Sequence, residues 1–374
     1  MKILISGDYC PRDRVAEVFE KGNYGAVLEE FVPVIKEADY SIVNLECPVV
    51  TADSQPIEKV GPNLKTSVKG IEALKWVGFN CVTLANNHIL DYGDEGVRQT
   101  IEALDSAGIE HVGGGVNLNE ASKTLYKTIG NETLAIINCC EHEFSIASEN
   151  SAGSNPLNVV KQYRAIKEAK QKQKADYVLV IVHGGHEHWQ LPSVRMVEAY
   201  RFFIDAGADA VVNHHQHCFG GYEVYNGKTI FYGLGNFCFD NPEKRKGIWT
   251  EGYAVTIDFA KERKGFTRHP YTQCAETPSI KLQPGGIYDV RIKELNDIIQ
   301  NDKALKEQNS NYYRRCSEQY ENAFEPIRNR WYLGAKRRGW LPSLISGEKK
   351  LLLENFIVCE SHLDKVIWWL ASRD

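Results

Sequence analysis

The chain has 374 residues, of which 43% are hydrophobic and 25% are charged, a composition typical of globular proteins. A net charge of −5 argues against broad binding to nucleic acid, which requires a basic surface. No run approaches the roughly 20 apolar residues of a transmembrane helix, and the apolar run Ile3–Ile5 is too short for a signal peptide. We therefore expect a cytoplasmic protein with no transmembrane segment, no nucleic-acid partner and ten cysteines that are reduced.

Short β-branched runs alternate with helical patterns along most of the chain. This alternation predicts an α/β fold. The expected strands are Ile3–Ile5, Tyr40–Leu45, Cys81–Leu84, Leu134–Ile137, Tyr177–Val182, Ala210–Val212 and Thr229–Tyr232. The expected helices are Tyr24–Ala38, Ser67–Val77, Asp94–Ala107, Val159–Lys172 and Ser193–Ala206.

The pattern changes after Gly252. Two further strand-like runs, Tyr253–Phe259 and Phe266–Tyr271, are expected to pair in antiparallel fashion and to finish a second sheet. The Pro- and Gly-containing segment Ala275–Gly286 indicates a boundary. We predict a catalytic domain over residues 1–275 and a mostly helical C-terminal appendage over residues 286–374. Its expected helices are Val290–Gln308, Asn311–Phe324 and Lys349–Ala371.

Oxygen and imidazole donors follow five of the predicted strands, at the strand ends where α/β folds place ligand-binding groups. Carboxylate and amide oxygens mixed with imidazoles suit Mn²⁺, Fe or Zn²⁺ better than Ca²⁺. We expect one or two divalent transition-metal ions, with a carboxylate such as Asp8 or Glu46 bridging ions about 3.5–4 Å apart if two are bound. The predicted metal ligands are Asp8, Asn44, Glu46, Asn87, His88, His183, His215 and His217.

Other polar residues near these strand ends receive catalytic or substrate-binding roles. His215 and His217 are two residues apart and are expected to face the same side of an extended segment, which leaves His214 a supporting role. Glu187 is the best acid or base candidate, and a nearby histidine is expected to protonate the leaving group. The predicted catalytic residues are His88, Glu187 and His217. The predicted substrate-binding residues are Arg12, Arg14, His186 and Asn236.

Six short motifs follow one another along the chain between Lys2 and Asp240. They are Gly7-Asp8, Asn44-Leu45-Glu46, Ala85–His88 with Asp91–Gly93, His183–Gly185 with Glu187, His214–His217 and Tyr232–Phe237. With these motifs the chain resembles the CapA family of capsule and poly-γ-glutamate synthesis proteins, which is related to calcineurin-like metallophosphoesterases. The resemblance implies a four-layer α/β/β/α sandwich with a two-metal site between two sheets. Cys10 departs from the metallophosphoesterase pattern, which has a histidine there, so either one ion is bound tightly or a different ligand set is used.

Each motif also has an ordinary structural interpretation. Asp8 alone is typical of a turn after a strand, and Asn86-Asn87 alone is typical of a helix start. His183 alone is typical of the polar end of a buried strand. Three imidazoles between His214 and His217 are harder to explain in this way, because burying them without a metal or acidic partners is costly.

The appendage carries a basic segment at residues 326–350, with tryptophans among its lysines and arginines. This composition suits peripheral contact with an anionic membrane, or contact with an acidic polymer or a protein. The alternative, which we favour, is a helical cap whose aromatic side chains pack on the catalytic domain.

The combined prediction is a metal-dependent hydrolase of the CapA family. Its substrate is expected to be an anionic small molecule or polymer, cleaved at a phosphoester, an amide or a related bond during capsule, polysaccharide or poly-γ-glutamate biosynthesis. The alternative is a non-catalytic accessory component of capsule assembly that binds polymer or nucleotide in the same pocket.

Overall fold

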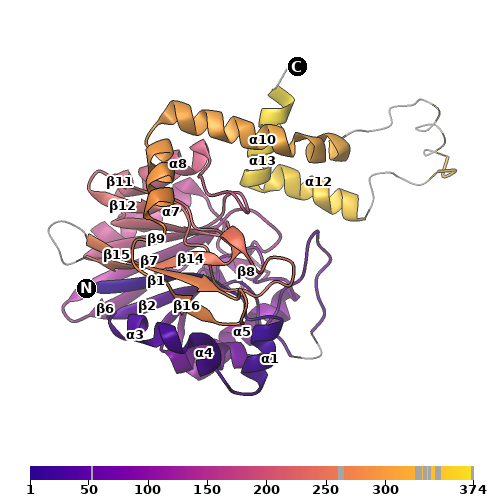
Figure 1. Cartoon of the computed structure of the whole chain (residues 1–374). Coiled ribbons are helices and arrows are strands. Elements are labelled where there is room, and N and C mark those ends of the chain that lie inside the picture. The colour runs from indigo at the N-terminus through magenta and orange to yellow at the C-terminus, as the bar shows by residue number, and fades with distance from the viewer. Residues whose placement is uncertain are drawn as a thin grey trace.

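Two large sheets form the centre of the fold, and helices cover their outer faces (Figure 1). The computed structural model describes residues 1–51, 54–259, 265–324, 331, 335, 338–341 and 347–371. One hydrophobic core lies between the sheets and continues beneath the helices of the second sheet, and another lies between the first sheet and its own helices. The predicted four-layer α/β/β/α sandwich is confirmed.

The first sheet has four parallel strands on one side and antiparallel strands on the other. The strands expected to finish a second sheet instead extend this one, because β14 pairs with β1 from Lys2–Asp258 to Ile5–Val255. The sheet order is β16 (Ile280–Leu282), β15 (Gly265–Gln273), β14 (Glu251–Asp258), β1 (Lys2–Tyr9), β2 (Tyr40–Leu45), β3 (Cys81–Thr83) and β4 (Glu110–Val112), with β13 (Asn236–Cys238) also paired to β1.

The second sheet has a parallel centre, β7-β9-β10-β12, with an antiparallel strand at each edge. Its order is β11 (Tyr222–Tyr225), β12 (Lys228–Phe231), β10 (Ala210–His214), β9 (Tyr177–His183), β7 (Glu132–Cys140) and β6 (Leu125–Ile129). A separate pair is formed by β5 (Gly114–Gly115) and β8 (Gly153–Ser154). The buried central strands match the continuous apolar runs in the sequence.

The helices that cover the first sheet are α1 (Arg14–Glu20), α4 (Val68–Val77) and α5 (Gly93–Ala107). Those that cover the second sheet are α7 (Val159–Gln171) and α8 (Val194–Ala206). Ser67 caps α4, since its side chain accepts the backbone N–H of Lys69. The single helix expected over Tyr24–Ala38 is wrong. The helix changes to 3-10 geometry at Glu29–Phe31, and a new helix then starts around Pro33, which has no backbone N–H to donate. The segment forms α2 (Gly25–Leu28), η1 (Glu29–Phe31) and α3 (Val32–Lys36), and shorter helices elsewhere are α6 (Leu118–Ala121) and η2 (Gly247–Trp249).

The C-terminal part contains α9 (Asp289–Ile299), α10 (Asp302–Phe324), α12 (Glu348–Val358) and α13 (Glu360–Ala371). The helix expected over Lys349–Ala371 is interrupted at Cys359, whose backbone is extended. The segment expected to be a boundary contributes β16 to the first sheet, and Ile292 and Ile299 of α9 pack into the core between the sheets. The division into two domains stays a prediction.

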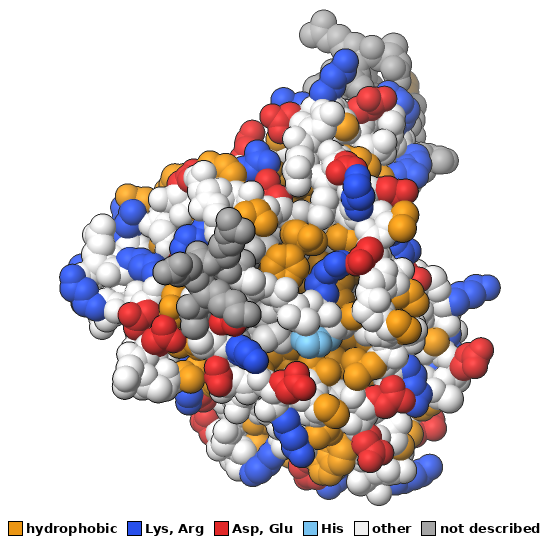
Figure 2. Space-filling view, turned by 60° about the vertical axis from the view of Figure 1, so that its left-hand side comes forward, with side chains coloured by type: hydrophobic (Ala, Val, Ile, Leu, Met, Phe, Trp, Pro, Cys, Tyr) orange, Lys and Arg blue, Asp and Glu red, His pale blue; other side chains and the backbone are white. Residues whose placement is uncertain are grey.

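No helix among the described residues is long and apolar enough to span a bilayer. All ten cysteines are free thiols, as predicted, and nine of them are buried. On the face drawn in Figure 2, acidic and basic side chains are interspersed with small apolar areas. Most of the basic segment 326–350 lies outside the described residues, although Trp331 and Trp340 are described and are 85% and 71% exposed.

Candidate metal centre

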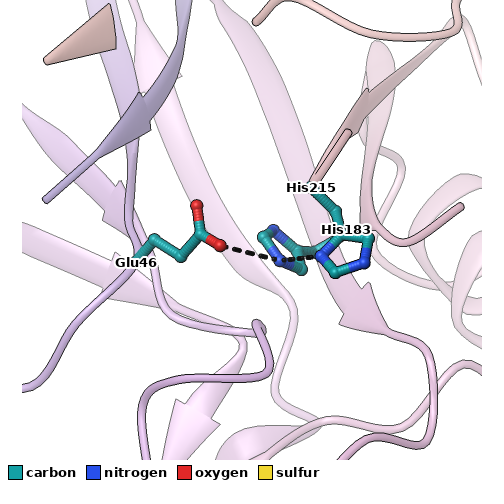
Figure 3. Close-up of side chains that lie close together, drawn as sticks. All are labelled: Glu46, His183 and His215. Carbon is teal, nitrogen blue, oxygen red and sulfur yellow. Dashed lines mark hydrogen bonds and ion pairs between the residues drawn. The ribbon is translucent and has the colours of Figure 1, made fainter. Parts of the chain in front are cut away.

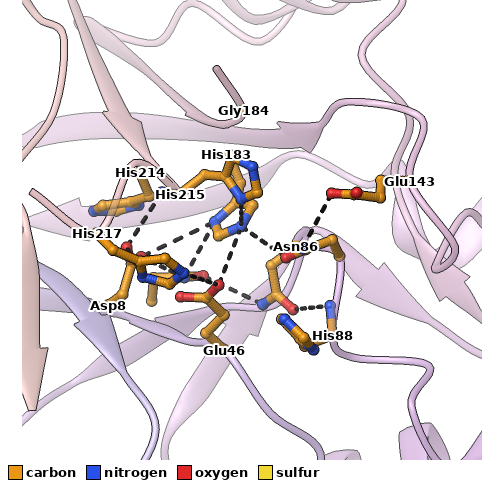
Figure 4. Close-up of polar contacts among 12 residues, drawn as sticks. Asp8, Glu46, Asn86, His88, Glu143, His183, Gly184, His214, His215 and His217 are labelled. Carbon is orange, nitrogen blue, oxygen red and sulfur yellow. Dashed lines mark hydrogen bonds and ion pairs between the residues drawn. The ribbon is translucent and has the colours of Figure 1, made fainter. Parts of the chain in front are cut away.

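The donors predicted at the strand ends meet at one edge of the two sheets (Figure 4). In the first sheet Asp8 of β1 pairs in register with Asn44 of β2, and Glu46 follows directly. In the second sheet His183 of β9 pairs in register with His214 of β10. Neighbouring parallel strands end at the same edge, so residues far apart in the sequence converge there.

Glu46, His183 and His215 form the first of two clusters (Figure 3). Oε1 of Glu46 lies 3.6 Å from Nε2 of His183. Nδ1 of His215 lies 3.1 Å from the same nitrogen of His183. All three side chains are buried, and together they offer one carboxylate oxygen and two imidazole nitrogens.

Asp8, Glu46 and His217 form the second cluster. Oε1 of Glu46 lies 3.6 Å from Nε2 of His217, and Oδ2 of Asp8 lies 3.8 Å from Nδ1 of His217. Glu46 therefore belongs to both clusters and uses the same oxygen toward both. Glu46 would therefore be available to an ion held by either cluster.

The protonation of these residues fits a cation site. Neither carboxylate oxygen of Glu46 has a hydrogen-bond partner among the described residues. Burial, and then the charge of Asp8, raise the pKa of Glu46 well above its usual value. Burial also raises the pKa of Asp8 to about 6 and lowers that of His217 to about 3. Buried, unpaired carboxylates are costly unless a cation offsets them, and neutral imidazole is the form that binds metals.

The histidines after β10 lie in a strained turn. His215 has φ 93° and His217 has φ 53°, values that non-glycine residues rarely adopt and that are often found at functional sites. Each side chain belongs to a cluster that contains Glu46, but the extended segment expected here is wrong, because both residues have a positive φ. The backbone N–H of His215 donates to Oδ2 of Asp8 at 3.2 Å, which ties this turn to β1.

Two asparagines orient the candidate ligands. Oδ1 of Asn236 lies 2.9 Å from Nδ1 of His217, while its Nδ2 donates to the carbonyl oxygens of His217 and Trp249. These contacts turn Nε2 of His217 toward Glu46. Asn44 donates through Nδ2 to Oδ1 of Asp8 at 2.8 Å. These contacts favour supporting roles, so the ligand role of Asn44 and the substrate role of Asn236 stay predictions.

Asn87 approaches the first cluster from the loop after β3. Its Oδ1 lies 3.1 Å from Nε2 of His183, and its Nδ2 donates to Oε2 of Glu143 at 3.1 Å. Glu143 is absent from the predicted site. It lies in an irregular loop after β7, where no strand-end pattern marks it.

His88 forms a dyad with Asp91. Its Nδ1 lies 2.7 Å from Oδ2 of Asp91, which also accepts the backbone N–H of Leu64 at 2.6 Å. Lys59 pairs with Asp91 and lies 3.1 Å from Nδ1 of His88. The motif that contains Asp91 is visible in the sequence, whereas nothing in the sequence marks Lys59. The dyad leaves Nε2 of His88 as the nitrogen that can exchange a proton with a substrate.

The His217 side of the site has an aromatic and basic wall. The ring of Trp249 lies 4.8 Å from that of His217. Lys244 lies over Trp249, 4.5 Å from the ring centroid, and its Nζ is 2.7 Å from Nε2 of His188. Glu187 is exposed beside His188. Lys244 thus places a cation beside the candidate ligands, which suits an anionic ligand, whereas the side chain of Lys59 is buried and paired with Asp91.

The remaining predicted residues lie farther from the clusters. Arg12 pairs with Asp13 at 2.7 Å. Arg14 is held by Asp240 and by backbone carbonyls of residues 274–276, which favours a structural role. His186, expected to face substrate, is instead buried under α10, because its ring stacks on Tyr312. His214 lies against the carbonyl of Ser6 at 3.1 Å, consistent with its expected supporting role.

Cys10 stands where the metallophosphoesterase pattern has a histidine. It is buried, and its thiol makes a hydrogen bond with that of Cys47. Cys10 is in neither of the two clusters that contain Glu46.

Comparison with known proteins identifies the family. Residues 2–241 match the family described as bacterial capsule synthesis protein PGA_cap. A capsule biosynthesis protein CapA of Bacillus anthracis is 34% identical over 247 residues, which cover 64% of this chain and 60% of that protein. A PGA biosynthesis protein CapA of Bacillus subtilis (strain 168) is 32% identical over 237 residues, which cover 63% of this chain and 62% of that protein.

Solved structures give weaker likenesses. A putative 5'-nucleotidase from Staphylococcus aureus has 14% identity and a TM-score of 0.42 over 79% of this chain and 58% of that one. The match to the curated relatives spans about three fifths of their length. The resemblance to CapA proteins is confirmed by the family match, and the chain belongs to the bacterial capsule synthesis protein PGA_cap family.

Proposed function

We propose that this protein is a metal-dependent hydrolase that acts on an anionic polymer or its precursor in capsule or poly-γ-glutamate biosynthesis. The observation that carries the proposal is the shared carboxylate, because Glu46 belongs to both clusters and both of its oxygens lack a hydrogen-bond partner among the described residues. Divalent Mn, Fe or Zn suits this mixture of carboxylates and imidazoles. We also propose that the protein acts in the cytoplasm.

Different residues of the chain would bind the metal ions and the substrate. Asp8, Glu46 and His217 would hold one ion, and Glu46, His183 and His215 a second, with Asn87 adjacent to the second set. A bound divalent ion lowers the pKa of water and polarises a phosphoryl or carbonyl oxygen. Lys244 would bind negative charge of the substrate, and Lys59 would hold Asp91 in place beside His88.

His88 is the proposed general acid. Asp91 holds Nδ1 of His88 at 2.7 Å and fixes the orientation of the ring. The proton on Nε2 would then pass to the leaving oxygen or nitrogen as the scissile bond breaks, and solvent would restore it. Glu187 is exposed beside His188 and is a second acid or base candidate at the entrance.

Metal analysis combined with a hydrolysis screen tests the proposal. Protein purified without chelator would be analysed for bound metal and assayed with Mn²⁺, Fe²⁺ or Zn²⁺ on aryl phosphomonoesters, aryl phosphodiesters and poly-γ-glutamate. We expect metal-dependent turnover of at least one of these substrates, lost in Asp8→Asn and His215→Ala and kept in the distant control His111→Gln. Wild-type protein that binds no metal would contradict the whole proposal.

The alternative is a non-catalytic component that binds polymer or nucleotide at the same metal centre. Cys10 favours it, because this position departs from the metallophosphoesterase pattern and Cys10 is outside both clusters. Metal binding without turnover of any substrate in the screen would support this alternative. Poly-γ-glutamate binding that requires the bound metal would support it further.

A further inference from the structure

A second group of metal-binding side chains lies outside the centre built around Glu46. Glu143, Cys359 and His362 each offer one ligand atom, and the three atoms lie within 4.8 Å of one another. Glu143 belongs to the loop after β7, while the other two residues lie at the junction of α12 and α13. The group therefore joins two parts of the chain that are more than two hundred residues apart.

The junction presents the cysteine and the histidine together. Cys359 ends α12 with an extended backbone, and α13 starts at the next residue. The backbone N–H groups of His362 and Ser361 lower the pKa of the Cys359 thiol, although burial raises it more. This gives a Cys-x-x-His pair in which the sulfur faces the start of a helix, an arrangement that stabilises a thiolate.

Burial opposes that thiolate when no cation is present. Cys359 is 2% exposed, and burial together with Glu143 and Glu141 raises the pKa of its thiol. A divalent cation would reverse this balance, because a coordinating thiol is deprotonated by the ion. The released proton passes to solvent, so binding becomes stronger as the pH rises.

The distance between the carboxylate and the imidazole fits two ligands of one ion. Oε1 of Glu143 lies 3.6 Å from Nε2 of His362. Two ligands with bonds of about 2.0–2.2 Å to one tetrahedral ion are about 3.3–3.6 Å apart. Glu46 has the same spacing to its two histidines in the main centre.

A fourth donor is adjacent. Asn355 lies one turn before Cys359 in α12, is 7% exposed and donates through Nδ2 to Oε1 of Glu143 at 3.1 Å. Its Oδ1 has no hydrogen-bond partner among the described residues. Rotation of the side-chain amide would exchange the two atoms and offer this oxygen to an ion beside Glu143.

We propose that Glu143, Cys359 and His362 form a second, thiolate-containing metal site that fastens α12 and α13 to the loop after β7. One thiolate, one imidazole and one carboxylate form a ligand set that selects Zn²⁺ over Mg²⁺ or Ca²⁺. The site also reaches the main centre, because Oε2 of Glu143 holds the side-chain amide of Asn87. This inference does not depend on the hydrolase proposal.

Cobalt titration of the full chain tests this site. Co²⁺ bound to a thiolate gives an intense near-ultraviolet charge-transfer band, whereas Co²⁺ bound only to oxygen and nitrogen does not. We expect the band in the wild type, its loss in Cys359→Ser, and at least 10-fold weaker Co²⁺ binding in His362→Gln. In Zn²⁺, the metal content of Cys359→Ser should fall by about one equivalent.

Control variants separate this site from the main centre. Cys10 is the cysteine closest in sequence to Asp8, so Cys10→Ser tests whether the band comes from the main centre. We expect this variant to keep the band. Asp8→Asn and His217→Gln should also keep it, even where they abolish hydrolysis. The unfolding midpoint of each variant, measured with and without Zn²⁺, distinguishes loss of the site from loss of the fold. A wild type without the band, a band that persists in Cys359→Ser, or a band lost in Cys10→Ser would overturn the proposal and leave a simple ion pair between Glu143 and His362.

Discussion

Glu46 Oε1 lies 3.6 Å from His183 Nε2, and the same oxygen is 3.6 Å from Nε2 of His217. The buried carboxylate of Glu46, from the first sheet, thus lies between two histidines of the second sheet. His183 is at the end of β9, and His217 is in the turn after the neighbouring strand β10. The relationship depends on the convergence of the two sheets at one edge.

The first prediction concerns the stability of metal-free protein as a function of pH. Burial raises the pKa of Asp8 to about 6 from 3.8, so the folded state holds this proton more tightly than the unfolded state. Asp8 should therefore cost stability as the pH rises from about 4 to 6, with a total loss of about 3 kcal/mol that is complete above this window. Chemical unfolding in EDTA measures this cost as the difference between wild type and Asp8→Asn.

Parallel stability curves for the two proteins between pH 4 and 6 would contradict the assigned burial of Asp8. Saturating metal should abolish the destabilisation, because the cation favours the ionised carboxylate.

The second prediction concerns Asn236, which holds Nδ1 of His217 at 2.9 Å. Asn236→Ala should weaken metal binding by about 10–100-fold, the usual effect of removing a residue that orients a metal-bound histidine. Competition titration with a chelating dye measures this change. Asn119→Ala in α6 is the surface control, and unfolding midpoints show whether Asn236→Ala remains folded. Unchanged metal affinity in folded Asn236→Ala would show that Asn236 does not orient His217 for metal binding.

The third prediction concerns His88 and its partner Asp91. His88→Gln should lower kcat by about 10²–10⁴-fold on a phosphoester that the wild type hydrolyses, with KM and metal content nearly unchanged. The loss should be larger for esters with poor leaving groups, because these need the proton most. Asp91→Asn should act in the same direction, and His111→Gln should have no effect. Equal losses across leaving groups would argue against proton donation by His88.

Much of the centre could be predicted from the sequence, because its ligands follow buried strands. Asp8, Glu46 and His183 each lie within or directly after an apolar run, and parallel neighbours must end at the same edge. The paired histidines after β10 were also identifiable, although their strained turn was not, because local sequence does not reveal a positive φ at a histidine.

Other features depended on contacts between distant segments. Glu143, Lys59 and Lys244 lie in irregular loops that have no hydrophobic periodicity, so only the folded chain brings them to the site. The sheet that β14 joins was mispredicted for a related reason. The alternation of side chains along β14 identifies its buried face but does not reveal which strand it will pair with. That strand is β1, more than two hundred residues earlier in the chain.

The metal content of Glu46→Gln shows whether Glu46 is a metal ligand that both clusters share. Wild type, Glu46→Gln and the control His111→Gln would be purified without chelator, reconstituted with Mn²⁺, Fe²⁺ or Zn²⁺, and analysed by mass spectrometry for bound metal. Glutamine keeps the size of the side chain but removes the charge that both clusters share, so Glu46→Gln should lose at least one equivalent that the other two proteins retain. A wild type that binds none of the three metals, or Glu46→Gln with the full wild-type complement, would show that Glu46 is not a shared metal ligand.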